Sequence, residues 1–160
     1  MTTVRRFEAG DAPAVAGLIG RCLREVNSRD YPAEIIERMC AHFDPDRIAA
    51  LAGQREMFVA DAVGTAEAGR VAGTGGVAGT VSRDGNKVYT MFVRPDLAGR
   101  GIGRLLMRHI ESLAAAEGHG FMETGASISA HRFYQRLGYV DVRTSETEFG
   151  LNFILRRPLP

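Results

Sequence analysis

The residues best suited to chemistry form a glycine- and arginine-rich segment, Gly99-Arg100-Gly101-Ile102-Gly103-Arg104, which follows an apolar run typical of a strand. A turn containing Pro95 separates the two, and an apolar helical repeat begins at Ile102. The first backbone N–H groups of a helix are unpaired and carry partial positive charge, and glycines let an anion approach them closely. The segment therefore predicts a phosphate or pyrophosphate site at the start of a helix.

Two other phosphate-binding loops do not fit this segment. A Walker A loop requires Gly-Lys followed by Ser or Thr, and the sequence has no such run. A dinucleotide-binding loop would carry a glycine where Leu106 stands, and it would follow its strand without the intervening residues 95–98. A glycine-rich turn that only begins a helix is the remaining alternative.

Two motifs resemble those of the GNAT superfamily of N-acetyltransferases. The segment FVRPDLAGRGIGRLLM is similar to its coenzyme A signature, a V-x-P turn followed by Q/R-x-x-G-x-G/A at the start of a long helix. Downstream, GASISAHRFYQRLGYVDV is similar to the family motif A-x-x-F-Y-x-x-x-G-F, which begins here at Ala130. The chain departs from the first motif at Ala98, where the family carries Gln or Arg. This change removes one side chain from the loop but keeps its backbone amides.

The resemblance implies an acetyl-CoA-dependent N-acetyltransferase in which a primary amine attacks the thioester directly. Coenzyme A would then be a cosubstrate, and no metal is expected. The resemblance also implies that the pantetheine arm lies along Met91, Phe92 and Val93, and that the pyrophosphate lies on residues Gly99–Arg104. Ser129 is a further candidate for coenzyme binding.

Tyr134 occupies the position of the tyrosine that commonly protonates the departing coenzyme A thiolate in this family. A phenol suits this role because it is neutral at pH 7 and can donate a proton to a developing sulfur anion. The spacing of Ala130, Phe133, Tyr134 and Leu137 is also that of an ordinary apolar helix face, so a packing role is the alternative.

The motifs do not identify the general base. Many family members carry a glutamate on the strand before the V-x-P turn, but Lys87–Val93 contains no carboxylate. Glu123, on the next expected strand, is our candidate, and a solvent-facing strand residue is its alternative. His42 and His131 titrate near neutral pH, and Asp30 is a candidate for contacting the acceptor amine.

The apolar periodicity predicts a strand, helices, three strands, a helix, a strand, a helix and two strands. An Asp84-Gly85 turn predicts a hairpin. The expected strands are residues 4–8, 57–61, 69–82, 87–93, 121–126, 139–142 and 148–155. The first expected helix follows an N-cap at Asp11, with Pro13 in its first turn, and continues to Val26. The others are residues 32–43, a helix from Ile102 that stops at Gly118, and residues 130–137, with a short additional helix containing Ile48 and Leu51.

Together with the resemblance, this order predicts an α/β (α+β) GNAT fold as a single domain over residues 1–160. The expected sheet is mixed and mostly antiparallel, with about six to seven strands. The family implies a V-shaped splay between the two central strands and about four helices distributed on both faces.

Composition limits the function classes. A formal net charge of +1 with 24% charged residues argues against a general nucleic-acid binder. The apolar runs are too short to cross a membrane, and the N-terminal residues lack the apolar region of a signal peptide, so a cytoplasmic protein is expected. Cys22 and Cys40 have no metal-ligand spacing and are expected to be free thiols.

The acceptor side is left open by the motifs. Its partner is an amine, either a small molecule or a protein amine, and Glu146, Glu148 and Asp141 offer a hypothetical cation-binding rim. A homodimer through Phe149–Leu155 is a further hypothesis. The main alternative function is a non-catalytic acyl-CoA-binding sensor of the same fold, and an interaction module without a coenzyme site is the third.

Overall fold

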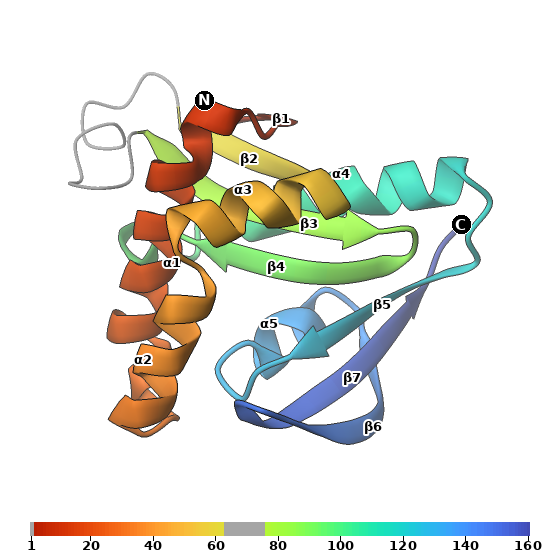
Figure 1. Cartoon of the computed structure of the whole chain (residues 1–160). Coiled ribbons are helices and arrows are strands. Elements are labelled where there is room, and N and C mark those ends of the chain that lie inside the picture. Colours follow the sequence, from red (N-terminus) through yellow and green to blue (C-terminus); the bar gives the residue numbers. More distant parts are fainter. Residues whose placement is uncertain (1, 63–75) are drawn as a thin grey trace.

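The computed structural model describes residues 2–62 and 76–160, and these residues contain one seven-stranded mixed sheet in the order β1-β2-β3-β4-β5-β7-β6. The strands are β1 (Thr2–Arg6), β2 (Glu56–Ala62), β3 (Val77–Asp84), β4 (Lys87–Val93), β5 (Phe121–Ala126), β6 (Val140–Thr147) and β7 (Gly150–Pro158). The helices are α1 (Ala12–Glu25), α2 (Ala33–His42), α3 (Pro45–Gln54), α4 (Ile102–Ala116) and α5 (His131–Arg136). Figure 1 shows their arrangement.

The central strands β4 and β5 pair in parallel, whereas every other neighbouring pair in the sheet is antiparallel. Their register covers only Lys87 opposite Glu123 and Val88 opposite Thr124. Beyond these positions the two strands diverge, as Figure 1 shows. The expected mixed sheet with a central splay is therefore confirmed.

Helices cover both faces of the sheet. Successive strand residues point to opposite faces, so Met57 and Val59 join the core under α1, α2 and α3, while Phe58 and Ala60 join the core under α4 and α5. In Figure 1, α3 crosses in front of the strands, α1 runs past their left-hand ends and α4 lies behind. The described residues thus contain five α-helices, which correspond to the four helices and the short additional helix expected from the sequence.

Helix α3 is longer than the short helix expected from Ile48 and Leu51. It begins directly after Asp44, whose side chain accepts a hydrogen bond of 2.8 Å from the Arg47 backbone N–H, and Pro45 takes the first helical position. An acidic N-cap followed by proline is a strong helix start because it satisfies one free amide and presets φ. This segment therefore forms a helix of three turns.

Strand boundaries differ from the sequence predictions mainly at the chain ends. The first strand lies at residues 2–6 rather than 4–8, because Glu8 and Asp11 form a reciprocal cap that starts the helical region. The last two strands are longer than expected and meet at Gly150, which has φ +104°. The predicted hairpin at Asp84-Gly85 is confirmed, with Asp84 opposite Lys87. Residues 69–75 of the expected third strand lie outside the described residues.

None of the helices in the described ranges is long and apolar enough to cross a membrane.

Candidate active site

The glycine segment forms a loop that ends in the N-terminus of α4. Gly99 and Gly101 have φ values of +79° and +83°, a left-handed conformation that residues with a Cβ adopt only with strain. Gly101 is the N-cap residue, and no side chain caps the helix. The backbone N–H groups of the first turn are therefore available to an anion. Arg100 and Arg104 are exposed beside them.

Gly103 is required by packing as well as by the loop. A Cβ at this position would lie 2.7 Å from Cε1 of Phe133 and 3.1 Å from Cε of Met91. The first turn of α4 therefore packs directly against the aromatic side chain of α5 and against β4. The sequence motif pointed to this glycine, but only the structure supplies this steric reason.

Four of the expected coenzyme-binding residues meet around one cavity of about 160 Å³. Met91, Phe92 and Val93 of β4 line it together with Ser129 and Tyr134 from the α5 region. The rest of its lining consists of Cys22, Val26, Asn27, Ala130 and Phe133. We call it the β4 cavity. It lies where β4 has separated from β5, so the splay of the sheet creates it.

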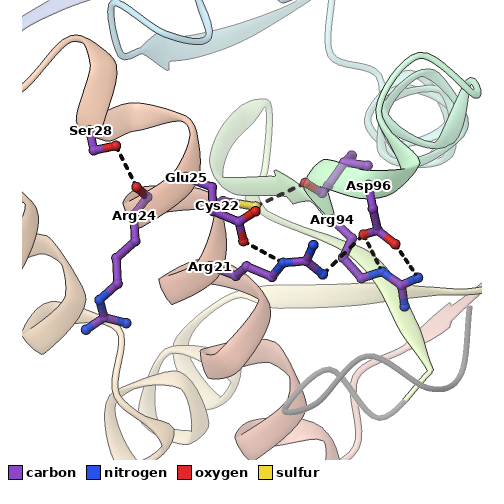
Figure 2. A network of polar contacts seen from close by, with 8 residues as sticks. Arg21, Cys22, Arg24, Glu25, Ser28, Arg94 and Asp96 are labelled. Atoms are coloured by element: carbon purple, nitrogen blue, oxygen red, sulfur yellow. Dashed lines mark hydrogen bonds and ion pairs between the residues drawn. The ribbon is translucent and has the colours of Figure 1, made fainter.

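Cys22 of α1 contacts the backbone of β4 at the edge of this cavity. Its Sγ donates a hydrogen bond of 3.0 Å to the Val93 carbonyl oxygen (Figure 2). Burial raises the pKa of the Cys22 thiol to about 12, so the group is a neutral donor and a poor nucleophile near pH 7. The sequence identified Cys22 only as a buried thiol, because its partner is a backbone atom 71 residues away.

A polar network fixes the turn that leads from β4 to the glycine loop (Figure 2). Arg94 is fully buried and binds Asp96 through two hydrogen bonds of 2.8 and 2.9 Å. Asp96 also accepts from Arg21 of α1 at 3.3 Å, and Arg21 binds Glu25 at 2.6 Å. Arg94 holds the pKa of Asp96 below its usual value, so the carboxylate remains charged. The network ties the loop to α1.

Tyr134 is 3% exposed and reaches the region between β4 and β5. Burial raises its pKa to about 12, and the neighbouring Thr124 hydroxyl opposes this rise. The Tyr134 and Thr124 hydroxyls are neighbours but do not form a hydrogen bond of full geometry. The buried Thr124 Oγ1 thus has no hydrogen-bond partner among the described residues. Tyr134 is therefore a neutral phenol over the whole physiological pH range, next to a hydroxyl with unused hydrogen-bonding capacity.

Two further cavities adjoin each other along the splay. The Glu123 cavity has a volume of about 450 Å³ and is lined by Glu123 and Thr124. The Tyr134 cavity has a volume of about 370 Å³ and is lined by Tyr134 and Met91. The two share apolar walls that include Met39, Phe43, Phe92 and Phe149. They thus form one continuous depression next to the β4 cavity.

The candidate bases fall in different places. Glu123 lines its cavity, with a side chain 14% exposed whose Oε2 accepts 3.0 Å from Nε of Arg156. His42 lines the same cavity, and its Nδ1 lies 3.1 Å from Nη2 of Arg47. The structure therefore places Glu123 and His42 in the Glu123 cavity and Tyr134 in the adjoining one.

The other two candidates lie outside the three cavities. His131 stacks on Phe153 with ring centroids 3.9 Å apart, and its Nε2 lies 2.7 Å from Asp141. Asp30 accepts a hydrogen bond of 2.7 Å from the Ser129 hydroxyl. The site thus gains Asn27, Thr124 and Cys22, none of which carried a sequence signal, since each comes from a different element and only folding brings them together.

The described residues contain no group of three or more His, Cys, Asp or Glu side chains that could hold a metal ion.

Comparisons with known proteins identify the family. Residues 28–155 match the family model described as acetyltransferase (GNAT) domain. A search of curated protein sequences gives no match. Among solved structures, a GCN5-related N-acetyltransferase from Rhodopseudomonas palustris has 23% identity and a TM-score of 0.84, covering 99% of this chain and 96% of that one.

Two similar structures contain the coenzyme. The PaiA N-acetyltransferase from Thermoplasma acidophilum, in complex with coenzyme A, has 14% identity and a TM-score of 0.75, and 99% of each chain is covered. YncA from Salmonella typhimurium, with acetyl-CoA, has 17% identity and a TM-score of 0.60, covering 99% of this chain and 94% of that one. The fold is common to all three, and the family model spans most of the sequence. The chain belongs to the GNAT acetyltransferase family.

Proposed function

We propose that this protein is an N-acetyltransferase that transfers an acetyl group from acetyl-CoA to a primary amine, with residues 1–160 acting as one catalytic domain. One observation carries the proposal. Met91, Val93 and Tyr134 line the β4 cavity, and the start of α4 packs at Gly103 against two of its lining residues, Met91 and Phe133. This arrangement suits a long thioester donor whose phosphates and reacting end bind at different elements.

The residues fit coenzyme A by their chemistry. Gly99 and Gly101 present the uncapped amides of α4 to a pyrophosphate, and Arg100 and Arg104 add positive charge. The exposed backbone of β4 offers hydrogen bonds to the two amides of pantetheine, because the strand has no ladder partner on β5 beyond Val88. PaiA and YncA hold the same coenzyme in the same fold.

The proposed reaction is a direct transfer. The neutral amine attacks the thioester carbonyl carbon, so a C–N bond forms and the C–S bond breaks. The thiolate that leaves takes a proton from the Tyr134 hydroxyl. Cys22 is not an acyl carrier in this scheme, because its raised pKa keeps it protonated.

The amine must lose a proton during transfer, and Glu123 is our proposed acceptor for it. Because Glu123 lies opposite Lys87, toward the far end of the depression from Tyr134, the proton would reach it through intervening water. Glu123 lines the Glu123 cavity together with apolar residues such as Phe43 and Phe92, and Arg156 donates a hydrogen bond to its carboxylate. A base on β5 would compensate for the absence of a carboxylate on β4.

Thermal unfolding with and without acetyl-CoA tests the proposal, since it requires no knowledge of the acceptor. At about 100 times its dissociation constant, acetyl-CoA should stabilise the fold by about 2.7 kcal/mol. For a chain of this size this raises Tm by several degrees, roughly 5 °C, while adenosine should have no effect. Absence of a shift at millimolar acetyl-CoA would refute the coenzyme site. A shift without thiol release across a broad amine panel would favour the sensor function instead.

Thr124 is proposed as a positioning residue for Tyr134 and the acceptor. Thr124→Val should lower kcat roughly tenfold, because the phenol loses its polar neighbour, without lowering Tm. Removing a buried hydroxyl that has no partner leaves nothing unsatisfied, so stability should be unchanged or higher. Thr124→Ser keeps the hydroxyl and should restore the rate. Equal rates for the Val and Ser variants would exclude this role. Steady-state thiol release and thermal unfolding measure both effects.

A further inference from the structure

The Glu123 cavity and the Tyr134 cavity together form the space proposed for the acceptor amine, which we call the acceptor space. Its two ends are lined by residues of different chemistry. Tyr134 and Met91 line the end that adjoins the β4 cavity, where transfer is proposed to occur. Arg55 and Lys87 line only the other end, in the Glu123 cavity. Lys87 and Met91 are separated along β4 by about 13 Å, from about 3.3 Å per strand residue. Between them lie the aromatic walls shared by both cavities.

The walls between the two ends are apolar and aromatic. Phe43 packs edge-to-face on Phe92, with ring centroids 5.9 Å apart. Phe149 contacts His42 in the same manner at 5.7 Å. Such walls favour a ligand whose middle is apolar and of aromatic size, since they offer dispersion and ring contacts but few hydrogen bonds.

Charge at the far end is positive. The guanidinium of Arg55 lies over the Tyr89 ring, 3.8 Å from its centroid, which holds it in place. Neither Arg55 nor Lys87 forms an ion pair with a carboxylate of the described residues. The Glu123 carboxylate at this end is already matched by Arg156 at 3.0 Å. Two cations therefore face the cavity without a compensating anion from the described chain.

The carboxylates of the final hairpin do not offset the positive charge of Arg55 and Lys87. Asp141 is occupied by His131 at 2.7 Å and by Gln135 at 3.2 Å. Glu148 lines the Tyr134 cavity, but it is 63% exposed and lies 3.9 Å from Nη2 of Arg38. Glu146 lines neither acceptor cavity. The three do not gather into a cation-binding rim, and a polyamine would place its second charge against Arg55 and Lys87.

We infer that the acceptor is an amine with an apolar, aromatic-sized body that ends in an anionic group, and that Arg55 and Lys87 bind this group. The inference rests on the proposed function, because the reacting end is defined by Tyr134. It specifies a substrate class: the amine points to the thioester, the body lies between Phe43, Phe92 and Phe149, and the anion lies at the start of β4.

Three benzylamines that differ only in the distal group test the inference. They are 4-(aminomethyl)benzoate, 4-methylbenzylamine and p-xylylenediamine, which carry negative, neutral and positive distal groups. With saturating acetyl-CoA, kcat/KM for thiol release should be about tenfold higher for the anionic amine than for the neutral one. The cationic amine should be the poorest substrate.

Variants connect this preference to the named residues. Arg55→Gln and Lys87→Gln should each lower kcat/KM for the anionic amine severalfold more than for 4-methylbenzylamine, so that the preference for the anionic amine shrinks. Arg143→Gln, an exposed position on β6 outside both cavities, should change neither rate. The Tm of each variant confirms that it folds.

The outcomes separate the inference from the proposed function. Thiol release with equal or better use of the neutral or cationic amine overturns the inference and leaves the acetyltransferase assignment intact. The inference is also wrong if acetyl-CoA raises Tm but none of the three amines either releases thiol or stabilises the complex further. If acetyl-CoA itself gives no shift, the proposed function fails and the inference fails with it.

Discussion

Tyr134→Phe should lower kcat for acetyl transfer roughly 100-fold while leaving the affinity for acetyl-CoA nearly unchanged. The substitution removes only the hydroxyl that is proposed to protonate the thiolate, and the ring keeps its contacts with Phe133 and Tyr139. Stability should change little, because the hydroxyl makes no hydrogen bond of full geometry with Thr124. Stopped or continuous thiol assays, with coenzyme titration by thermal shift, measure the two quantities separately.

Tyr139→Phe is the matched control. Its hydroxyl donates a hydrogen bond of 2.5 Å to the buried Glu111 carboxylate, which also binds Arg157 at 2.8 Å. Loss of this charge-assisted bond should cost about 2 kcal/mol of unfolding free energy, without a comparable loss of kcat. Tyr134→Phe should therefore lower kcat with little change in stability, whereas Tyr139→Phe should lower stability with little change in kcat. If Tyr134→Phe lowers Tm and leaves kcat intact, Tyr134 is a packing residue only.

The pH profile provides a second test of Tyr134. Burial raises its pKa to about 12, above the usual value near 10, so the proton-donating form persists at higher pH than for an exposed phenol. The rate should therefore show no decline from tyrosine ionisation between about pH 8 and 10, where an exposed tyrosine would begin to lose its proton. A decline centred near pH 10 in wild type, absent in a variant with Tyr134 removed, would contradict this.

Gly103→Val should weaken acetyl-CoA binding at least about tenfold. Any Cβ at this position lies within 2.7 Å of Phe133, and overpacking of this kind costs about 1–3 kcal/mol. The Phe133 ring borders the β4 cavity, so displacing it narrows the space proposed for pantetheine. Coenzyme-induced stabilisation, measured relative to the Tm of the variant itself, reports the loss.

Two controls separate this clash from a general intolerance of the glycine change. Gly53→Ala lies in α3 with no atom within 4 Å of the added Cβ, and it should leave coenzyme binding unchanged and raise stability slightly. Combining Gly103→Ala with Phe133→Leu should recover part of the affinity lost in Gly103→Ala alone, since the two residues are in contact. Additive effects in the double variant would show that the ring is not the cause.

Local signals in the sequence determined most of the fold. The β3–β4 hairpin follows from Asp84-Gly85, and Gly85 adopts the positive φ, +58°, that such a turn requires. Helix α4 follows from the apolar repeat that begins at Ile102. A short helix containing Ile48 and Leu51 was also expected, but its start at Asp44-Pro45 and its full length came only from the structure, because the apolar pattern there contains only two strong positions. The central splay came from the family resemblance rather than from any local pattern.

The coenzyme side of the candidate site was predictable because its recognition uses backbone. A loop of glycines at a helix start and a strand beside it are both encoded within one continuous stretch, from β4 to the first turn of α4. That stretch determines its own conformation through turn chemistry and helix capping, so its residues could be named from the sequence.

The acceptor side was decided only by tertiary structure. Arg55 ends α3, Lys87 begins β4 and Phe149 lies in the turn between β6 and β7, and no local pattern relates them. The pairing of Glu123 with Arg156 and of Cys22 with the Val93 carbonyl depends likewise on which strands and helices become neighbours. Short-range preferences fix the elements and the loop between them. The cavity's charge and shape arise from side chains that converge only when the strands pair and the helices pack on the sheet, and therefore only the folded chain reveals them.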